Sequence, residues 1–376
     1  MKQTNDRVDR YLRTVHKLGT PCYIYDGDII KRQYSRLKEA LPRCEILYSL
    51  RANPHPDVVY LLRNVGAGAD VFSEGELERA LRAGILAHNI SFAGPGKTED
   101  ELRMAIGTEV AAIAVESIQE LELLNALARQ MGTQAHITLR IGTGKFGIDE
   151  EQLPEFLSQY QKCTNVIFDG LHFSTHAVPL DAQDLLAKFN HNLEFAQRIQ
   201  REAGRPFKII NLGGGFCIPM FPGEKALDLT VFKDFAPHKM FPQTRFFIEA
   251  GRYLTGPAGV YIAKVLYTKK SRDTEYIIID GGMHQNAFAC GLYAKTAPRN
   301  FDIRILNKIN AKPERTYSIA GPLCTSFDTL ARDIQLPEVV PGDLICVLNS
   351  GAYGFSMSPL DFGSRQRPRE ILLSKS

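Results

Sequence analysis

The chain has 376 residues, of which 44% are hydrophobic and 23% are charged, and this ordinary composition excludes a disordered chain or a mini-protein. Its 45 basic and 42 acidic side chains give a formal net charge of +3 without a long basic run, so we expect no nucleic-acid partner. No apolar stretch approaches the roughly 20 residues that span a bilayer, and the polar N-terminus lacks the apolar core of a secretory signal. These features predict a cytoplasmic protein without a membrane partner.

The seven cysteines are scattered and form no CxxC pair, which argues against a disulfide framework and against a metal site.

Most of the chain alternates between strand-like and helix-like segments. The N-terminal stretch is helical in character, and CYIYD (22–26) is typical of a strand. Eight strand-like runs follow at residues 45–50, 69–72, 89–93, 110–115, 136–141, 166–173, 208–212 and 245–249. Helix-patterned stretches lie between them, for example 56–65, 74–84, 97–107 and 117–132. Because apolar strands joined by helices favour a parallel sheet buried on both faces, the pattern predicts an α/β fold with a (β/α)8 TIM barrel over residues 30–255, in preference to an open doubly wound sheet.

The alternation of strand-like and helix-like segments ends after Glu249. The strand-like runs 259–270, 274–281, 316–321, 343–351 and 369–374 are short, separated by turn residues and accompanied by little helical patterning. This predicts a C-terminal all-β domain over residues 256–376. We expect residues 1–29 to supply a helix and a strand that joins the sheet of this domain.

The loops that follow the barrel strands carry the candidate chemistry, because reactive residues of such barrels project from the carboxyl ends of the strands. Three consecutive glycines, Gly213 to Gly215, let the backbone approach an anion closely, and Arg252 adds a charge-assisted contact. Phosphate is the favoured ligand, although the glycines alone are equally typical of a tight turn. Glu249 ends an apolar strand and is a candidate partner for a protonated ring nitrogen, with a structural ion pair as the alternative.

The β-domain adds a second group of polar candidates. Cys324 and Asp328 lie four residues apart in GPLCTSFD, a spacing that suits an acid and an amine-binding group. Tyr353 lies between glycines in NSGAYGFS. The alternatives are an inert buried thiol for Cys324 and a packing role for Tyr353.

Nine motifs in chain order connect these residues to a known family: YSLRANPHP, GADVFSEGEL, FAGPGK, KFGI, NLGGGF, EAGR, DGGMH, GPLCTSFD and SGAYGFSMS. The series resembles the fold-type III pyridoxal-phosphate decarboxylases, which include diaminopimelate and ornithine decarboxylases. It is most similar to their biosynthetic-cluster and exosortase-associated branch, some members of which act on aminoacyl groups tethered to a carrier protein. The resemblance implies an alanine racemase-like barrel plus a β-domain, the cofactor pyridoxal 5'-phosphate, and a homodimer with shared active sites. It also implies a partner that is either a small amino-acid substrate or an acyl or peptidyl carrier protein.

The resemblance also assigns roles to individual residues. It makes Glu249 the partner of the pyridinium nitrogen and Cys324, from the neighbouring subunit, a proton donor to the carbanion. Asp328 would meet the amino group or side chain of the substrate, and Tyr353 would reach the cofactor or substrate. The phosphate site would consist of Gly213, Gly214, Gly215, Gly251 and Arg252.

Two positions depart from the family pattern. Arg51 stands where the family has the lysine that forms the Schiff base with the cofactor, and a guanidinium that stays protonated cannot take that role. The explanations are an introduced substitution, a natural pseudoenzyme, or noncovalent binding of the cofactor; attachment at Lys97 or Lys145 ranks below these. Ser174 occupies the position of a cofactor-stacking histidine. His172 or His176 is a candidate substitute, but an ordinary polar loop histidine is the favoured interpretation of both.

The substrate pocket departs from the diaminopimelate enzymes as well. Thr325 replaces their amine-binding glutamate after the cysteine, and the segment Phe288–Tyr293 lacks their arginine. The sequence therefore predicts pyridoxal-phosphate-dependent decarboxylation of another amino acid or of a carrier-bound aminoacyl group in a biosynthetic pathway. The alternatives are a noncatalytic protein that binds the cofactor or a phosphometabolite and, ranked last, an amino-acid racemase.

Overall fold

The computed structural model describes residues 2–174, 181–292 and 299–374. The chain divides into two compact units. The barrel unit comprises residues 31–217 and 226–251, and the β unit comprises residues 1–30, 218–225 and 252–376. The sequence placed the borders at 29/30 and 255/256; in the structure the short segment 218–225 also belongs to the β unit.

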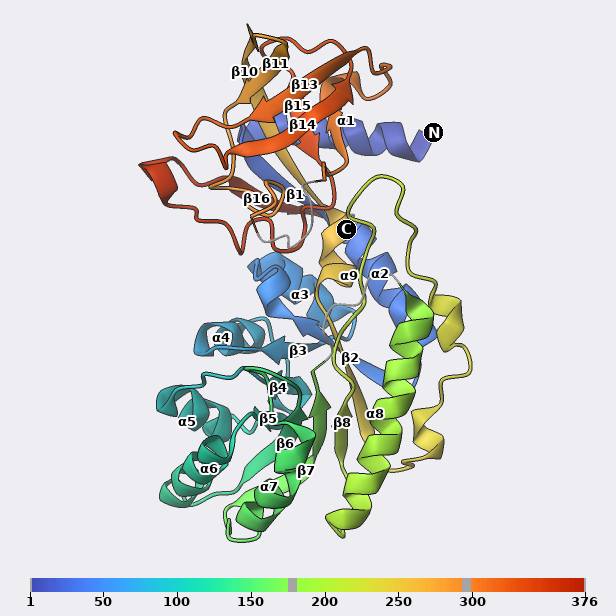
Figure 1. The fold of residues 1–376 in the computed structure, drawn as a ribbon, viewed down its shortest axis with the longest axis vertical. Coiled ribbons are helices and arrows are strands. Elements are labelled where there is room, and N and C mark those ends of the chain that lie inside the picture. The colour runs from blue at the N-terminus through green and yellow to red at the C-terminus, as the bar shows by residue number, and fades with distance from the viewer. Residues whose placement is uncertain (1, 175–180, 293–298, 375–376) are drawn as a thin grey trace. The chain divides into compact units, whose positions relative to one another are not determined.

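Eight parallel strands close into a barrel, as the sequence predicted (Figure 1). They are β2 (Cys44–Ser49), β3 (Gly68–Val71), β4 (Ile90–Phe92), β5 (Ala112–Val115), β6 (Ala135–Ile141), β7 (Val166–Phe173), β8 (Ile209–Asn211) and β9 (Arg245–Ala250). The barrel closes where β9 pairs in parallel with β2, with Ile46 opposite Ile248. Side chains from four strands, Leu47, Ala112, Ile209 and Phe247, pack inside it, so the barrel is a filled core and not a pore.

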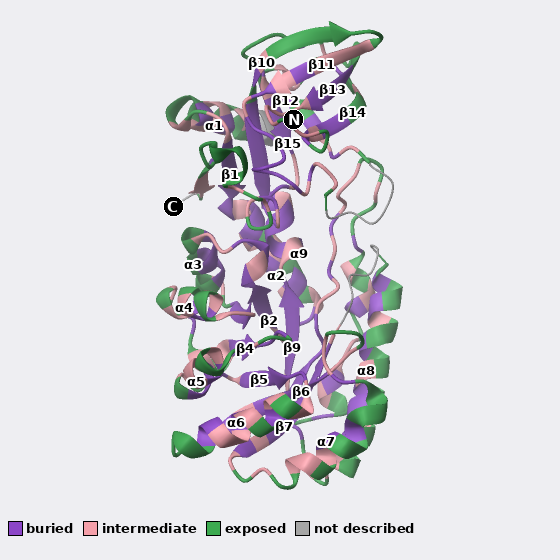
Figure 2. Ribbon diagram, turned by 60° about the vertical axis from the view of Figure 1, so that its left-hand side comes forward, coloured by how far each residue is buried: buried purple, intermediate pink, exposed green. Residues whose placement is uncertain are grey.

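Helices surround the barrel strands. They are α2 (Gly27–Ala40), α3 (Pro56–Asn64), α4 (Glu74–Arg82), α5 (Glu99–Gly107), α6 (Ile118–Gln130), α7 (Leu153–Tyr160) and α8 (Ala182–Glu202). Figure 2 shows buried strands and helices whose outer faces are exposed. Several helices begin at a polar cap: the side chains of Ser73, Thr98 and Ser117 each accept a backbone N–H of the first turn. This capping fixes where each loop ends and the helix starts.

The β unit contains an eight-stranded sheet. Its strands are β1 (Cys22–Asp26), β10 (Gly259–Ser271), β11 (Thr274–Ile279), β12 (Ile303–Ile305), β13 (Arg315–Ala320), β14 (Thr329–Leu336), β15 (Leu344–Val347) and β16 (Arg369–Leu373). The main path runs β12-β15-β10-β11-β13-β14, and β1 pairs with β10 and β16. The N-terminal strand thus joins this sheet, and Tyr11 and Val15 of α1 (Lys2–Leu18) pack against Cys22 and Ile24 of β1.

Sequence patterning missed two strands of this sheet. Strand β12 is only three residues long. In β14 the register shifts where Arg332 and Asp333 lie between paired residues, and Asp333 has a φ of 49°. Such a bulge breaks the two-residue alternation by which strands are recognised. A short helix, α9 (Arg252–Thr255), directly follows β9. Among the described residues, the structure has no helix with the length and apolarity needed to cross a membrane.

Candidate active site

Polar side chains gather at the carboxyl ends of the barrel strands. They are Arg51 after β2, Asp70 in β3, Glu116 after β5, Arg140 in β6, His172 in β7, Asn211 in β8 and Glu249 in β9. All except Arg51 are buried. Their positions on adjacent strands bring together charges that are up to 198 residues apart in the chain: Arg51 and Glu249 approach to 3.9 Å.

Arg51 lies between two buried carboxylates. Its Nη1 donates to Asp70 Oδ2 at 2.6 Å, and its Nη2 lies 3.9 Å from Glu249 Oε2. The guanidinium carbon stands 4.2 Å from the centre of the Phe72 ring, a cation–π distance. Arg51 is therefore held in place by an ion pair and by stacking, at the position that the resemblance gives to the attachment lysine.

Glu249 is a buried carboxylate with contacts from two other strands of the barrel. Asn211 Nδ2 donates to Glu249 Oε1 at 2.8 Å, and His172 Nε2 lies 3.0 Å from the same oxygen. Burial alone would raise the pKa of Glu249, but the charge and hydrogen bond of His172 and the positive charges of Arg51 and Arg140 outweigh it, and the net pKa is lowered. Glu249 is thus an ionised carboxylate in an enclosed site, as a partner for a protonated ring nitrogen has to be.

His172 is not the polar loop histidine that the sequence favoured. It lies in β7, is fully buried, and its Nδ1 has no hydrogen-bond partner among the described residues. The physical reason is its place in the strand, which directs the ring towards Glu249 and away from solvent. His176, the other candidate, lies outside the described residues.

Asp70 has the opposite electrostatic behaviour to Glu249. Burial raises its pKa, the positive charge of Arg51 partly opposes that rise, and the negative charge of Glu249 adds to it. Ser49 also donates its hydroxyl to Asp70 Oδ2 at 2.7 Å. Two neighbouring carboxylates with pKa values displaced in opposite directions are typical of sites that hold or move protons.

A second buried ion pair supports the loops around the site. Arg140 Nη1 donates to Glu116 Oε1 at 2.7 Å, and both side chains are less than a tenth exposed. The Glu116 carboxylate also accepts the backbone N–H groups of Gly94, at 2.6 Å, and of Gly147, at 2.9 Å. Arg140 Nη2 donates to the Ser174 hydroxyl at 3.3 Å. Ser174 is thereby placed beside the cluster, on the side chain of Arg140.

The glycine turns provide room for an anion. Gly213 and Gly215 have φ values of 76° and 110°, a region that favours glycine. A Cβ on Gly214 would lie 3.2 Å from the backbone oxygen of Glu249, and one on Gly251 would lie 2.9 Å from Ala52 Cβ. Side chains are excluded from these turns, so their backbone can approach a phosphate. The enclosed, ionised Glu249 and these turns fit the ring and phosphate of pyridoxal phosphate, whereas Arg51 offers no amine to attach it.

The two lysines considered as replacement attachment points differ sharply. The Lys97 side chain is wholly buried, and its Nζ contacts the backbone oxygens of Gly94 and Ala114 and, at 2.7 Å, Glu120 Oε1. Lys145 is exposed, with its Nζ 5.1 Å from the centre of the Phe146 ring. The contacts of Lys97 thus stabilise its own loop, and its amine is not available to attach a cofactor.

In the β unit, Arg252 lies between two aromatic rings. Its guanidinium carbon is 4.6 Å from the ring centres of both Tyr353 and Phe288. Tyr353 has a φ of 64°, a strained conformation for a residue with a bulky side chain and one that concentrates at functional sites. Cys324 is exposed, so the inert buried thiol is the wrong interpretation of this cysteine.

Asp328 is less available to a substrate than the sequence suggested. It is 2% exposed, and its two oxygens accept the backbone N–H groups of Met283, at 2.6 Å, and Leu323, at 2.7 Å. A Cβ on Gly282 or Gly321 would lie 2.3 Å from Asp328 Oδ1. Asp328 therefore joins the DGGMH loop to the loop that carries Cys324, and its contact with substrate stays a prediction.

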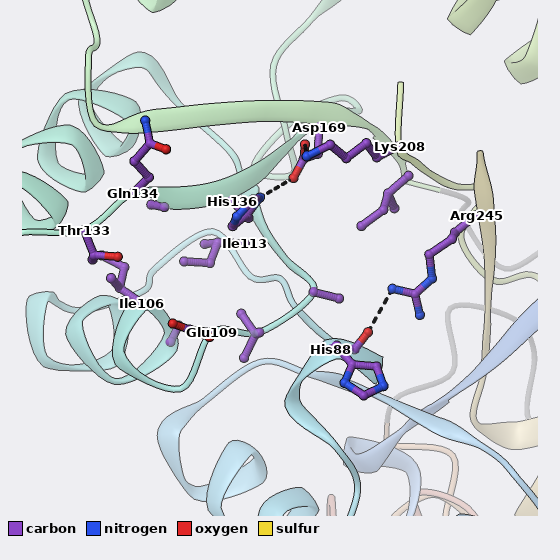
Figure 3. Close-up of a pocket in the computed structure, with 15 residues that line it drawn as sticks. His88, Ile106, Glu109, Ile113, Thr133, Gln134, His136, Asp169, Lys208 and Arg245 are labelled. Carbon is purple, nitrogen blue, oxygen red and sulfur yellow. Dashed lines mark hydrogen bonds and ion pairs between the residues drawn. The ribbon is translucent and has the colours of Figure 1, made fainter. Parts of the chain in front are cut away.

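A cavity of about 620 Å³ lies at the opposite, amino-terminal end of the barrel (Figure 3). There Asp169 contacts His136 Nδ1 at 2.5 Å and Lys208 Nζ at 3.1 Å. Arg245 donates to both oxygens of Glu45 and to the His88 backbone oxygen. This end of a barrel contributes stability in enzymes of this fold, so the cavity is not the candidate active site.

The sequence analysis did not assign Asp70, Asn211, Arg140 and Glu116, and it considered His172 only as a substitute for the cofactor-stacking histidine. One signal marks four of them: a polar residue interrupts an apolar strand, as in GADVF, TLRI, GLHF and IINL. Such a residue must have a partner when it is buried. The sequence did not reveal which partner, because that depends on the order of the strands around the barrel.

Comparisons with known proteins agree with this geometry. Residues 27–256 match the family model described as "Pyridoxal-dependent decarboxylase, pyridoxal binding domain". The chain is 36% identical to the L-glutamyl-[BtrI acyl-carrier protein] decarboxylase of Niallia circulans, over 95% of this chain and 89% of the relative. It is 32% identical to the diaminopimelate decarboxylase of Aquifex aeolicus, over 94% of this chain and 87% of the relative.

Solved structures give the same result. The diaminopimelate decarboxylase of Helicobacter pylori complexed with L-lysine superposes with a TM-score of 0.87 at 28% identity, covering 96% of this chain and 94% of that one. The corresponding enzyme of M. jannaschii superposes with a TM-score of 0.89 at 28% identity, covering 96% and 89%. The similarity therefore extends over both units.

Proposed function

Because the chain belongs to the fold-type III pyridoxal-phosphate-dependent decarboxylases, we propose that its barrel holds the cofactor without a covalent bond and that it decarboxylates a carrier-bound aminoacyl group. Decarboxylation of an amino acid or of a carrier-protein-bound group, with pyridoxal 5'-phosphate as cofactor, is the chemistry of the family. The proposal adds the manner of binding, the roles of the residues and the choice of substrate class.

Each role follows from an environment in the structure. The ionised Glu249, held by Asn211 and in contact with His172, pairs with the protonated ring nitrogen. The backbone of Gly213 to Gly215 and of Gly251, together with the Arg252 guanidinium, binds the phosphate. Ser174, bound by Arg140, lies beside the cofactor ring. When bound, the pyridoxal ring supplies an electron sink for the pair left behind as carbon dioxide departs.

Residues of the β unit supply the proton that replaces the departing carboxylate. The exposed Cys324 thiol donates the proton that replaces the carboxylate, and the strained Tyr353 contacts the cofactor or substrate. Asp328 acts as a positioning residue, because its carboxylate joins the loop of Cys324 to that of Met283. We further propose that the protein is a homodimer in which Cys324 acts in the active site of the neighbouring subunit. The location that we propose is the cytoplasm.

One observation supports noncovalent binding of the cofactor: the Arg51 guanidinium contacts Asp70 and Phe72 at the position where the family has its attachment lysine. Arginine has no free amine at accessible pH. Lys97 is buried against three acceptors, which argues against moving the attachment there. The cofactor therefore has to be retained by its phosphate, its ring nitrogen and the shape of the site.

The test is borohydride reduction in the presence of pyridoxal phosphate, followed by mass-spectrometric mapping of labelled peptides. We expect no specific label in the unmodified protein, a label at residue 51 in Arg51→Lys, and none in the matched control Arg51→Met. Gel filtration with the cofactor should show retention by the unmodified protein. Labelling of the unmodified protein at Lys97 or Lys145 would overturn the proposal, and so would failure to retain the cofactor.

Arg51 itself motivates one competing function, a noncatalytic cofactor- or phosphometabolite-binding protein. Carbon dioxide release by the unmodified protein, lost in Glu249→Ala and Cys324→Ala, excludes that alternative. Racemisation, the third hypothesis, requires solvent deuterium to enter the α-carbon while the carboxylate is retained, and the same assay distinguishes it.

Two positions support the carrier-bound substrate. Thr325 and the segment Phe288–Tyr293 lack the glutamate and arginine that the resemblance assigns to recognition of a charged distal end. An amino acid joined to a carrier through its distal carboxyl keeps the free α-carboxylate that leaves as carbon dioxide, and it has no charge at the distal end because the acyl linkage replaces that carboxylate. The relative from Niallia circulans is named for an acyl-carrier-protein substrate, which is consistent with this choice.

A further inference from the structure

His172 is a fully buried histidine of the barrel that has no role of its own among those proposed above. It interrupts the apolar strand β7. The pairing of β6 with β7 skips Asp169, and beyond this register shift His172 lies opposite Arg140. On the other side of β7, His172 lies opposite Asn211 of β8. Because opposite residues of neighbouring strands share a face of the sheet, the register places His172 among the buried polar side chains of the candidate site.

The two oxygens of the Glu249 carboxylate have different surroundings. Oε1 accepts a hydrogen bond from Asn211 Nδ2 at 2.8 Å and lies 3.0 Å from His172 Nε2. Within the described ranges, Oε2 has one ion pair, with Arg51 Nη2 at 3.9 Å, which is beyond hydrogen-bond distance. Oε2 is therefore the oxygen that is left to accept a hydrogen bond from a ligand.

Both donors to Oε1 are fixed in orientation. Asn211 Oδ1 accepts the backbone N–H of Gly213 at 2.9 Å, so the amide group directs its Nδ2 towards Glu249. An ionised carboxylate can only accept hydrogen bonds, so the hydrogen between His172 and Glu249 belongs to the histidine Nε2. Two buried donors thus occupy both lone pairs of Oε1.

The contact with His172 affects where a proton resides in the site. Burial raises the pKa of Glu249, and the charge and hydrogen bond of His172 are the largest of the influences that lower it, ahead of the charges of Arg51 and Arg140. The cluster also contains two further carboxylates, Asp70 and Glu116. A carboxylate that is hydrogen-bonded in its ionised form is a weaker base. When Glu249 pairs with a ring nitrogen, the nitrogen therefore keeps the proton.

We propose that His172 is a positioning residue that keeps the proton shared by Glu249 and the cofactor on the ring nitrogen. Its Nε2 hydrogen bond holds Glu249 in the ionised form and leaves Oε2 to accept from the ring N–H. The inference rests on the proposed function, because it takes Glu249 as the partner of the ring nitrogen, and it adds a residue that acts on the cofactor through Glu249. Charge at the ring nitrogen tunes the electronics of the cofactor, so His172 sets the strength of the electron sink.

The alternative is that the His172 ring only fills space inside the barrel, and a set of variants separates the two roles. His172→Phe and His172→Leu remove the donor with side chains of different size, so either one suffices if the other does not fold. His172→Gln keeps an N–H donor without the charge. His136→Phe is the matched control, because His136 contacts the buried Asp169 at the opposite end of the same barrel.

The measurement is the ring-nitrogen NMR resonance of 15N-labelled pyridoxal phosphate bound to the full-length protein, followed as a function of pH. We expect the ring nitrogen to lose its proton about one to two pH units lower in His172→Phe and His172→Leu, the equivalent of one charge-assisted hydrogen bond. His172→Gln should show a smaller shift, and His136→Phe should show none. An unchanged titration in the donor-free variants, or an equal shift in His136→Phe, would overturn the proposal.

The same titration in the Arg51→Lys background separates this inference from the proposed function. We expect the cofactor to be attached there, so its ring nitrogen is observed whether or not the unmodified protein retains the cofactor. A shift caused by His172→Phe in Arg51→Lys, with no retention by the unmodified protein in gel filtration, refutes noncovalent binding alone. Retention without any effect of His172 refutes the present inference alone.

A double-mutant cycle tests whether His172 acts through Glu249. Adding His172→Phe to Glu249→Gln should produce no further shift, because the carboxylate that His172 acts on is already gone. A further shift of the same size as in the wild-type background would show that His172 acts on the ring directly and would overturn its assignment as a positioning residue.

Discussion

The two ends of the barrel carry the same kinds of charged side chain in different surroundings. At the carboxyl ends, both Glu116 and Arg140 are less than a tenth exposed. At the amino ends, Asp169 is also buried, but its partners His136 and Lys208 are 41% and 60% exposed. Figure 3 shows these partners and Arg245 converging on the amino-terminal cavity.

The difference shows that solvent exposure decides how far each charge depends on its partner. A buried pair has lost the hydration of both ions, so each charge depends on its partner. A pair with one solvated member is screened and contributes little when it forms or breaks. Enclosed charges at the carboxyl ends have pKa values displaced in opposite directions, Asp70 raised and Glu249 lowered, whereas the carboxylate at the amino ends, Asp169, has two partly solvated partners and a lowered pKa.

The largest contrast between the two ends is expected from removing one arginine at each. Arg140→Met leaves the buried Glu116 without its cation, and loss of one partner of a buried pair destabilises by about 3–5 kcal/mol. Arg245→Met breaks a pair with Glu45 in which both side chains are over a third exposed, which costs about 1 kcal/mol or less. Urea unfolding of the two variants measures the difference, and equal losses would contradict the comparison.

The second contrast concerns cofactor affinity. Glu249→Gln keeps the shape of the side chain but removes the charge, and loss of one charge-assisted hydrogen bond should weaken pyridoxal phosphate binding about 10- to 100-fold. Glu45→Gln is the matched control at the amino-terminal end, where it should leave the affinity unchanged. Equilibrium dialysis against the cofactor measures both. An unchanged affinity in Glu249→Gln would remove Glu249 from the cofactor site.

The smallest effect is a pH dependence at the amino-terminal end. Burial alone would raise the pKa of Asp169, but hydrogen bonds and charge from His136 and Lys208 lower it overall. A carboxylate with a lowered pKa in the folded state stabilises above its unfolded value of about 3.9, and this contribution is lost as the pH falls through the folded value. Asp169→Asn should therefore be less stable at pH 7 by about 1 kcal/mol or less, because both partners of the carboxylate are partly solvated.

That difference should shrink as the pH falls below about 3.9, where the carboxylate of the unfolded chain becomes protonated first, and it is lost once the pH passes below the lowered pKa of the folded protein. Unfolding by urea at a series of pH values between 3 and 7 measures it. Asp234→Asn, at an exposed position of the same unit, is the control and should not change the profile. A stability difference that stays constant with pH would show that Asp169 acts by shape and not by charge.

Much of the architecture follows from local patterning. The run VIFDGLHF predicted β7 to the residue, Val166–Phe173, and the other seven barrel strands were placed within two residues at each end. The reason is that short apolar runs flanked by helical periodicity have few alternatives when a chain must bury them. The motifs likewise indicated the family and its cofactor, because the glycine turn, Glu249 and Cys324 follow one another along the chain in the order that the family has.

The tertiary structure decided what surrounds each of these residues. Only the order of strands around the closed barrel brings His172 of β7 and Asn211 of β8 to Glu249 of β9. The burial of Lys97 and the two backbone contacts of Asp328 likewise depend on loops that meet in space. Sequence determines which side chains are present and the period at which they recur, whereas partners, burial and pKa depend on distances between residues remote in the chain.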